Sequence, residues 1–164
     1  MRVLGIDPGL AITGYAIVVE DGGDEPRALT YGAIRTPAGQ PVASRLAQLY
    51  TALCAIVEEY RPQALAVENL FFGRNVTTAF MVGQARGVVL LCAAQHGLRV
   101  AEYKPTEIKQ ALVGYGNADK RQVQYMVRAQ LGLEETPRPD DVADALAVAV
   151  CHIFTARFQA RTME

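Results

Sequence analysis

The N-terminal segment, residues 1–36, contains three short apolar runs separated by turns, and this pattern constrains the fold more than any other feature of the chain. The runs cover residues 3–6, 13–19 and 29–36. An Asp-Pro-Gly turn follows the first run and an acidic turn follows the second. Short runs bounded by such turns are typical of strands joined as hairpins. We therefore predict that the sheet begins with three antiparallel strands.

After this start, helical and strand patterns alternate along the chain. Leu49, Leu53 and Val57 recur at helical spacing, and an apolar run that ends at Glu68 follows them. Beyond residue 36 the predicted elements are a helix around 46–57, strands at 64–67 and 98–101, and helices at 76–95, 105–112, 119–131 and 139–154. This order predicts an α/β protein with a five-stranded mixed sheet and helices on both faces.

Length and composition indicate one compact domain. The chain has 164 residues, 51% of them hydrophobic, which suits a single core and excludes a disordered chain. We assign residues 1–158 to this domain and residues 159–164 to a short C-terminal tail. The longest apolar run, residues 88–94, is far shorter than the roughly 18 residues of a membrane span. We expect a cytoplasmic protein without a membrane segment.

Cysteines and histidines give little indication of a metal site. Cys54, Cys92 and Cys151 are odd in number, far apart and embedded in apolar helical patterns, so we interpret them as buried thiols rather than bridges or a metal knuckle. His96 and His152 show no metal-ligand spacing, and we interpret them as ordinary helix residues.

The charges of the chain are unevenly distributed. The net charge is −1, but residues 71–128 carry +5 and the rest of the chain carries −6. A cationic surface beside an acidic pocket suits a metal-dependent enzyme that acts on a polyanion. Ordinary solvated charge explains the same distribution equally well.

Two carboxylates stand at the ends of apolar strands. Asp7 follows the first strand, and Glu68 ends the strand at 64–67. If these strands are parallel neighbours, both acids reach the crevice where ligands of open α/β sheets bind. The alternative reading is that Asp7 forms a turn and that Glu68 is an ordinary strand-end charge.

Two further carboxylates begin the last predicted helix. Asp141 and Asp144 are three residues apart, so both side chains lie on one helix face, toward the rim of the core. Acids at a helix N-terminus also simply stabilise it by about 0.3–1 kcal/mol each, and we assign only that role to Asp140. Four converging carboxylates would repel one another unless divalent cations such as Mg²⁺ bound them. Two ions about 3.5–4 Å apart would support phosphodiester hydrolysis.

Aromatic and basic residues lie close to these acids in the sequence. Phe71, Phe72, Arg74 and Asn75 follow Glu68 in a glycine-containing loop. An exposed Phe there would stack on or wedge between bases, which contributes roughly 1–3 kcal/mol per base. The alternative is a loop that folds over its own core.

Lys120 and Arg121 occupy the first turn of a predicted helix, where the helix dipole disfavours cations. A phosphate bound at this helix end would reverse the penalty, and Lys104 and Lys109 would extend the same basic track. The alternative is a small tolerated mismatch that Asp119 compensates.

Together these segments resemble the RuvC family of crossover junction endodeoxyribonucleases. The resemblance covers almost the whole chain. Its segments are Gly5-Ile6-Asp7-Pro8-Gly9, residues 68–75, residues 83–87, Lys104-Pro105, Ile108-Lys109-Gln110, residues 114–122 and residues 141–147. It implies an RNase H-like fold, a homodimer, Mg²⁺-dependent paired nicking of four-way DNA junctions with Mn²⁺ as an alternative ion, and a pathway shared with the RuvA–RuvB branch-migration machine.

The resemblance also implies roles for individual residues. The family's four catalytic, metal-binding acids fall on Asp7, Glu68, Asp141 and Asp144, although some relatives have His where this chain has Asp141. The family's DNA-contacting aromatic falls on Phe71, with Phe72 as a second candidate, and its lysines fall on Lys109 and Lys120. For the dimer, Gly83 and Gly87 on the predicted helix 76–95 would allow close helix approach; packing against the chain's own sheet is the alternative.

Two other functional classes compete with a nuclease. One is an architectural protein that binds branched DNA without cutting it, and four intact acids disfavour pure phosphate binding. The other is an actin-like kinase or ATPase whose phosphate loop is the Asp-Pro-Gly turn, but such enzymes close two domains over the nucleotide.

Overall fold

The computed structural model describes residues 1–22, 25–69 and 75–162. The elements are β1 (Arg2–Asp7), β2 (Ile12–Val19), β3 (Arg27–Arg35), α1 (Val42–Tyr60), β4 (Ala64–Glu68), α2 (Val76–Gln95), β5 (Arg99–Tyr103), α3 (Pro105–Val113), α4 (Lys120–Gln130) and α5 (Asp140–Thr162). The strand order is β3-β2-β1-β4-β5. β1, β2 and β3 pair antiparallel, whereas β4 pairs parallel to both β1 and β5. The predicted mixed sheet is confirmed.

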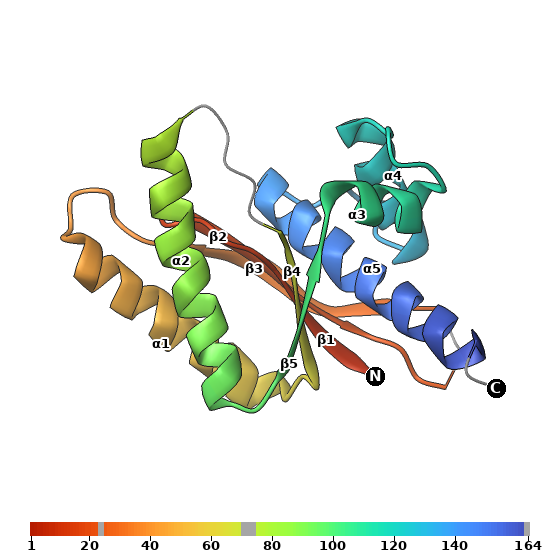
Figure 1. Ribbon diagram of the computed structural model, residues 1–164, viewed down its shortest axis with the longest axis horizontal. Coiled ribbons are helices and arrows are strands. Elements are labelled where there is room, and N and C mark those ends of the chain that lie inside the picture. Colours follow the sequence, from red (N-terminus) through yellow and green to blue (C-terminus); the bar gives the residue numbers. More distant parts are fainter. Residues whose placement is uncertain (23–24, 70–74, 163–164) are drawn as a thin grey trace.

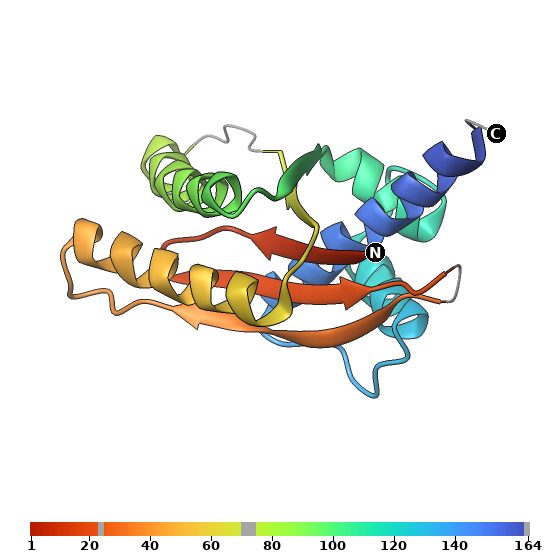
Figure 2. The same cartoon turned by 90° about the horizontal axis from the view of Figure 1, so that it is seen from below.

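Helices cover both faces of this sheet (Figures 1 and 2). Successive strand residues point to opposite faces, so Val3 packs in one core cluster and its neighbour Leu4 in the other. The first cluster joins the sheet to α3, α4 and α5, and the second joins it to α1 and α2. α5 is apolar nearly all round because the sheet covers one side of it and α3 and α4 cover another.

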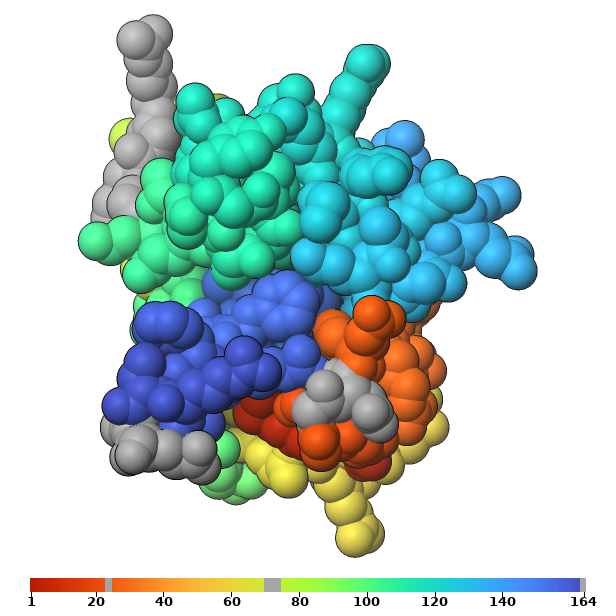
Figure 3. Space-filling view, turned by 90° about the vertical axis from the view of Figure 1, so that its right-hand side faces the viewer, coloured from red at the N-terminus to blue at the C-terminus, as the bar shows by residue number. Residues whose placement is uncertain are grey.

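α5 is longer than its apolar pattern predicts. We expected it to end at residue 154, but it continues to Thr162. Arg157 explains part of this extension, because its Nε donates to Glu20 Oε1 at 3.0 Å and ties the helix to the end of β2. The boundary expected between residues 158 and 159 falls within this helix, and the assignment of residues 1–158 to one domain stays a prediction. Figure 3 shows the end of α5 between the α3–α4 pair and the β2–β3 hairpin.

α2 is the one helix in the described part of the chain that is long and apolar enough to cross a membrane, with 20 residues and a mean hydropathy of 1.5. Core helices of globular proteins have the same length and composition. α2 packs on the sheet and α1 through Ala85, Val89 and Cys92, and its buried Arg86 is ion-paired with Glu102. We therefore interpret α2 as a core helix.

Candidate active site

The sheet brings Asp7 and Glu68 together. β1 and β4 are parallel neighbours with Ile6 opposite Val67, so the two acids that follow these residues end adjacent strands at the same edge. This is the arrangement that the sequence pattern predicted. The loop after Asp7 is held by Thr13, whose Oγ1 donates to the Gly9 carbonyl at 2.6 Å.

Two glycines allow α5 to approach this edge. A Cβ on Gly5 would lie 2.1 Å from the Ala145 carbonyl oxygen, and a Cβ on Gly14 would lie 2.0 Å from that of Asp141. No side chain fits in either place, so the start of α5 can rest directly on β1 and β2. Gly14 pairs with Asp7 across β1 and β2. Because the Asp141 backbone rests on Gly14, Asp141 lies close to the Asp7 end of β1. Sequence reasoning missed the role of Gly14, although an isolated glycine inside a strand indicates close backbone approach.

The electrostatics show that all four predicted acids interact. Burial, followed by the charges of Asp144, Asp141 and Glu68 in that order of size, raises the pKa of Asp7 to about 7. Burial, followed by the charge of Asp144, also raises the pKa of Glu68. Burial is likewise the largest cause of the raised pKa of Asp144. The ionised cluster is therefore costly without bound cations.

Lys120 partly compensates these charges. Its Nζ lies 3.1 Å from Asp140 Oδ2 and 3.5 Å from Asp144 Oδ2. Although burial acts to lower the pKa of Lys120, its hydrogen bonds and charge interactions with these two acids raise it overall. Lys120 is thus partnered by acids of α5, and its predicted contact with DNA phosphate stays a prediction. Asp119 caps α4 as expected, since its Oδ1 accepts from the Gln122 N–H at 2.9 Å.

A surface hollow lies beside the acids, between α3, α4 and α5. Two acids and two lysines line it together with apolar side chains. The lining residues are Glu68, Pro105, Ile108, Lys109, Lys120, Val123, Asp144 and Ala147. The charge of Lys109 lowers the pKa of Glu68, against the larger effect of burial, so this amine acts on the acid cluster from α3. The hollow has room and charge for a phosphate group next to the carboxylates.

Arg86 supports the site from the other side of the sheet. Its Nη1 donates to the Glu68 carbonyl oxygen at 2.5 Å, and its Nη2 lies 2.5 Å from Glu102 Oε2. The guanidinium therefore holds the end of β4, from which Glu68 projects. Sequence reasoning gave Arg86 no role, although a charged residue inside an apolar helix was the available signal.

Of the remaining predicted DNA-binding residues, those that the structure describes do not line this hollow. Lys104 is exposed before α3, and its backbone N–H donates to Glu107 Oε2 at 2.6 Å. Arg121 is exposed on α4 and lines a different hollow. Asn75 caps α2, because its Oδ1 accepts from the Thr78 N–H at 3.2 Å. Phe71, Phe72 and Arg74 lie outside the described residues.

The donor set of the acid cluster fits a hard divalent cation. Asp7, Glu68, Asp141 and Asp144 offer only carboxylate oxygens, the ligands that Mg²⁺ prefers. The pKa of Asp7 is raised first by burial and then by the three neighbouring carboxylates, and Lys120 lowers it by less, so the ionised carboxylate lacks sufficient compensating charge. A metal-dependent hydrolytic centre accounts for both observations.

Comparison with known proteins identifies the family. The family model described as "Crossover junction endodeoxyribonuclease RuvC" matches residues 3–152, which span all four acids. The chain belongs to the RuvC family. A RuvC from Chloroflexus aggregans is 60% identical over 156 residues, covering 95% of this chain and 94% of the relative. A RuvC from Heliobacterium modesticaldum is 63% identical over 151 residues, covering 92% and 93%.

A solved RuvC structure has the same fold. Thermus thermophilus RuvC in complex with a Holliday junction substrate superposes with a TM-score of 0.92 at 41% identity, covering 97% of this chain and 96% of that one. The similarity confirms the RNase H-like α/β class expected from the RuvC resemblance. Membership of the RuvC family also excludes the kinase reading of the Asp-Pro-Gly turn.

Proposed function

We propose that this RuvC family member is a crossover junction endodeoxyribonuclease that resolves four-way (Holliday) DNA junctions during recombination and repair. The observation that carries the proposal is the convergence of four carboxylates from β1, β4 and α5 beside the lysines of α3 and α4. We also propose a cytoplasmic location and a pathway shared with the RuvA–RuvB branch-migration machine, and the RuvC resemblance supports both.

The mechanism assigns distinct roles to the acids and the lysines. Asp7, Glu68, Asp141 and Asp144 would hold two Mg²⁺ ions, which supply Lewis-acid activation of water and stabilisation of the leaving oxygen when bound. Lys109 attracts a backbone phosphate into the hollow next to Glu68. Lys120, salt-bridged to Asp144, limits repulsion between that phosphate and the cluster.

One experiment separates this nuclease from the architectural alternative. The purified chain is incubated with a four-way junction and with a matched linear duplex, with and without Mg²⁺. We expect symmetric nicks in the junction alone, and only with Mg²⁺. Junction binding without nicks in Mg²⁺ or Mn²⁺ would support the architectural protein.

Lys109 tests the phosphate contact. Lys109→Ala should weaken junction binding in EDTA and reduce the slope of log affinity against log salt by about one unit, since each phosphate contact releases about one counterion. Lys120→Ala should change the slope less, because the amine is already paired with Asp140 and Asp144. The control is Arg128→Ala, an exposed cation at the far end of α4. Weaker binding of Lys109→Ala with an unchanged slope would assign Lys109 a structural role.

A homodimer would present one acid cluster to each of two equivalent strands of a junction, as a two-fold axis requires. α2 carries an exposed stripe suited to such an interface. Val76, Phe80 and Leu91 are 77%, 65% and 51% exposed, and Gly87 lies on the same side of the helix by its spacing. A Cβ on Gly87 would meet no atom of its own chain within 4 Å, so this glycine is open to a partner.

Gly87→Leu tests this interface. The open space around Gly87 lets the variant fold, whereas a leucine would block close approach of a second helix. We expect sedimentation to show a shift toward monomer and a cruciform plasmid to receive slow single nicks in place of paired incisions. Ala55→Leu on the exposed side of α1 is the control. A wild-type chain that is monomeric at micromolar concentration and still cuts in pairs would overturn the dimer proposal.

A further inference from the structure

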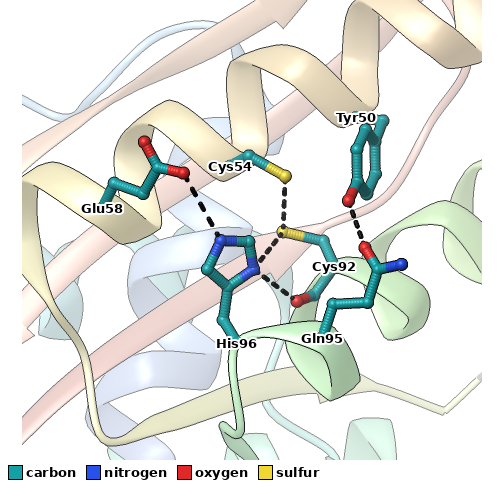
Figure 4. A network of polar contacts seen from close by, with 6 residues as sticks. All are labelled: Tyr50, Cys54, Glu58, Cys92, Gln95 and His96. Carbon is teal, nitrogen blue, oxygen red and sulfur yellow. Dashed lines mark hydrogen bonds and ion pairs between the residues drawn. The ribbon is translucent and has the colours of Figure 1, made fainter.

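A second group of metal-ligating side chains lies on the α1–α2 face, across the sheet from α5 (Figure 4). Cys54 on α1, Cys92 on α2 and His96 directly after α2 place one ligand atom each within 4.8 Å of one another. We propose that these three residues form a binding site for a thiophilic divalent cation, Zn²⁺, that links α1 to the end of α2.

The spacing of the three ligand atoms matches a tetrahedral centre. Cys54 Sγ lies 3.6 Å from Cys92 Sγ, which lies 3.8 Å from His96 Nδ1. Zn–S bonds of about 2.3 Å and Zn–N bonds of about 2.0 Å at tetrahedral angles give an S–S edge of about 3.8 Å and an S–N edge of about 3.5 Å. The third pair, Cys54 Sγ and His96 Nδ1, lies within 4.8 Å. A cation therefore fits between these atoms with small side-chain adjustments.

Glu58 completes the arrangement around His96. Its Oε1 lies 3.8 Å from His96 Nε2, on the ring edge opposite the sulfur atoms (Figure 4). A ligating histidine usually donates its other ring N–H to a carboxylate, which fixes the tautomer and turns the free nitrogen toward the metal. Here Glu58 would hold Nε2–H and leave Nδ1 for the cation. The present contact of Nδ1 with the Cys92 carbonyl, at 2.9 Å, would be given up.

The helices preorganise the group. Cys54 and Glu58 are four residues apart on α1, and Cys92 and His96 are four residues apart at the end of α2, so each pair shares one helix face. Cys92 is 2% exposed. A surface hollow lined by Glu58, Arg61 and His96, among others, adjoins the imidazole, so the group lies close to solvent.

The two metal sites of the chain would differ in ligand chemistry. Thiolate and imidazole select Zn²⁺, whereas the all-carboxylate cluster selects Mg²⁺. Under this proposal His96, Cys54 and Cys92 are ligands, whereas their sequence pattern indicated an ordinary helix residue and buried thiols. The two cysteines are 38 positions apart, so their proximity depends on how α1 packs against α2.

Cobalt is the direct probe of this site. The full chain is titrated with Co²⁺ in a phosphine reductant and excess Mg²⁺, which occupies the carboxylates. We expect thiolate-to-cobalt charge-transfer absorption that saturates at one Co²⁺ per chain and disappears when Zn²⁺ displaces the Co²⁺.

Variants of the ligands should bind Zn²⁺ more weakly. Cys54→Ser and His96→Gln should lower Zn²⁺ affinity at least about 100-fold, and Glu58→Gln about 10- to 100-fold. Cys151→Ser is the matched control, because it removes a buried thiol of α5 outside the group, and its affinity should stay within about twofold of wild type.

Thermal unfolding provides a second readout. Zn²⁺ should raise the Tm of wild type and of Cys151→Ser but not of Cys54→Ser, which should still cut junctions with Mg²⁺ because it is remote from the acids. Absence of the charge-transfer band, or its persistence in Cys54→Ser, would overturn the proposal. Formation of a Cys54–Cys92 disulfide in air, with Zn²⁺ binding absent in reductant, would overturn it in favour of a redox pair.

Discussion

Asp144→Asn is expected to lower the rate of junction cleavage by about 10³-fold or more while leaving junction affinity in EDTA unchanged or higher. Asp144 raises the pKa of both Asp7 and Glu68, so it lies at the centre of the cluster. Loss of a metal ligand removes several kcal/mol of transition-state stabilisation, and each 1.4 kcal/mol is about tenfold in rate. Asp7→Asn and Glu68→Gln should behave in the same way, and Asp141→Asn should be milder.

Asp140→Asn is the matched control for this series. Asp140 shares the first turn of α5 and the salt bridge to Lys120, but it is absent from the charges that shift the pKa of Asp7. Its variant should retain cleavage within about tenfold of wild type. A substantial residual rate for Asp144→Asn or Glu68→Gln in Mg²⁺, or an equal loss in Asp140→Asn, would count against the four-carboxylate assignment.

Local patterns were sufficient to predict the sheet and most of the acid cluster. Apolar runs bounded by turns predicted each strand, and the strand-end positions of Asp7 and Glu68 predicted that parallel pairing would bring them together. Asp141 and Asp144 followed from helical spacing. The positions of the strands and of these acids depend on the spacing of apolar residues and on strand direction, and both can be read from residues that are close together in the sequence.

Features that depend on distant partners were not predictable in this way. α5 runs past residue 154, in part because Arg157 meets Glu20, which belongs to the other end of the chain. Lys120 pairs with acids of α5 because α4 packs against α5, and the sequence pattern did not indicate this contact. Gly14 matters because it leaves room for the Asp141 backbone; an isolated strand glycine indicates close approach but not which segment approaches.

In the absence of divalent cations, Asp7→Asn is expected to stabilise the protein at neutral and higher pH. The pKa of Asp7 is about 7 in the folded protein against an ordinary value of 3.8, so the native state binds the proton more tightly than the unfolded state. Ionisation of Asp7 therefore destabilises the wild type progressively as pH rises from about 4 to about 7, and the loss is complete above that range. The shift corresponds to at most about 4 kcal/mol, and solvent access to the partly buried carboxylate reduces this to about 2 kcal/mol.

Thermal unfolding in EDTA at pH 4 and pH 8 measures this effect. At pH 8 the Tm of Asp7→Asn should exceed that of wild type by about 4–8 °C, because about 1 kcal/mol shifts the Tm of a domain of this size by about 2–4 °C. At pH 4 the Tm values of Asp7→Asn and wild type should nearly coincide.

The control Asp140→Asn should give no gain in Tm at pH 8, since Lys120 lowers the pKa of Asp140 through its hydrogen bond and charge. Mg²⁺ should raise the Tm of wild type more than that of Asp7→Asn, because Mg²⁺ bound to the native state offsets the cost of the ionised Asp7 carboxylate. A lower Tm for Asp7→Asn than for wild type in EDTA at pH 8 would mean that the ionised Asp7 carboxylate does not destabilise the fold, and bound cations would then not be needed to offset it.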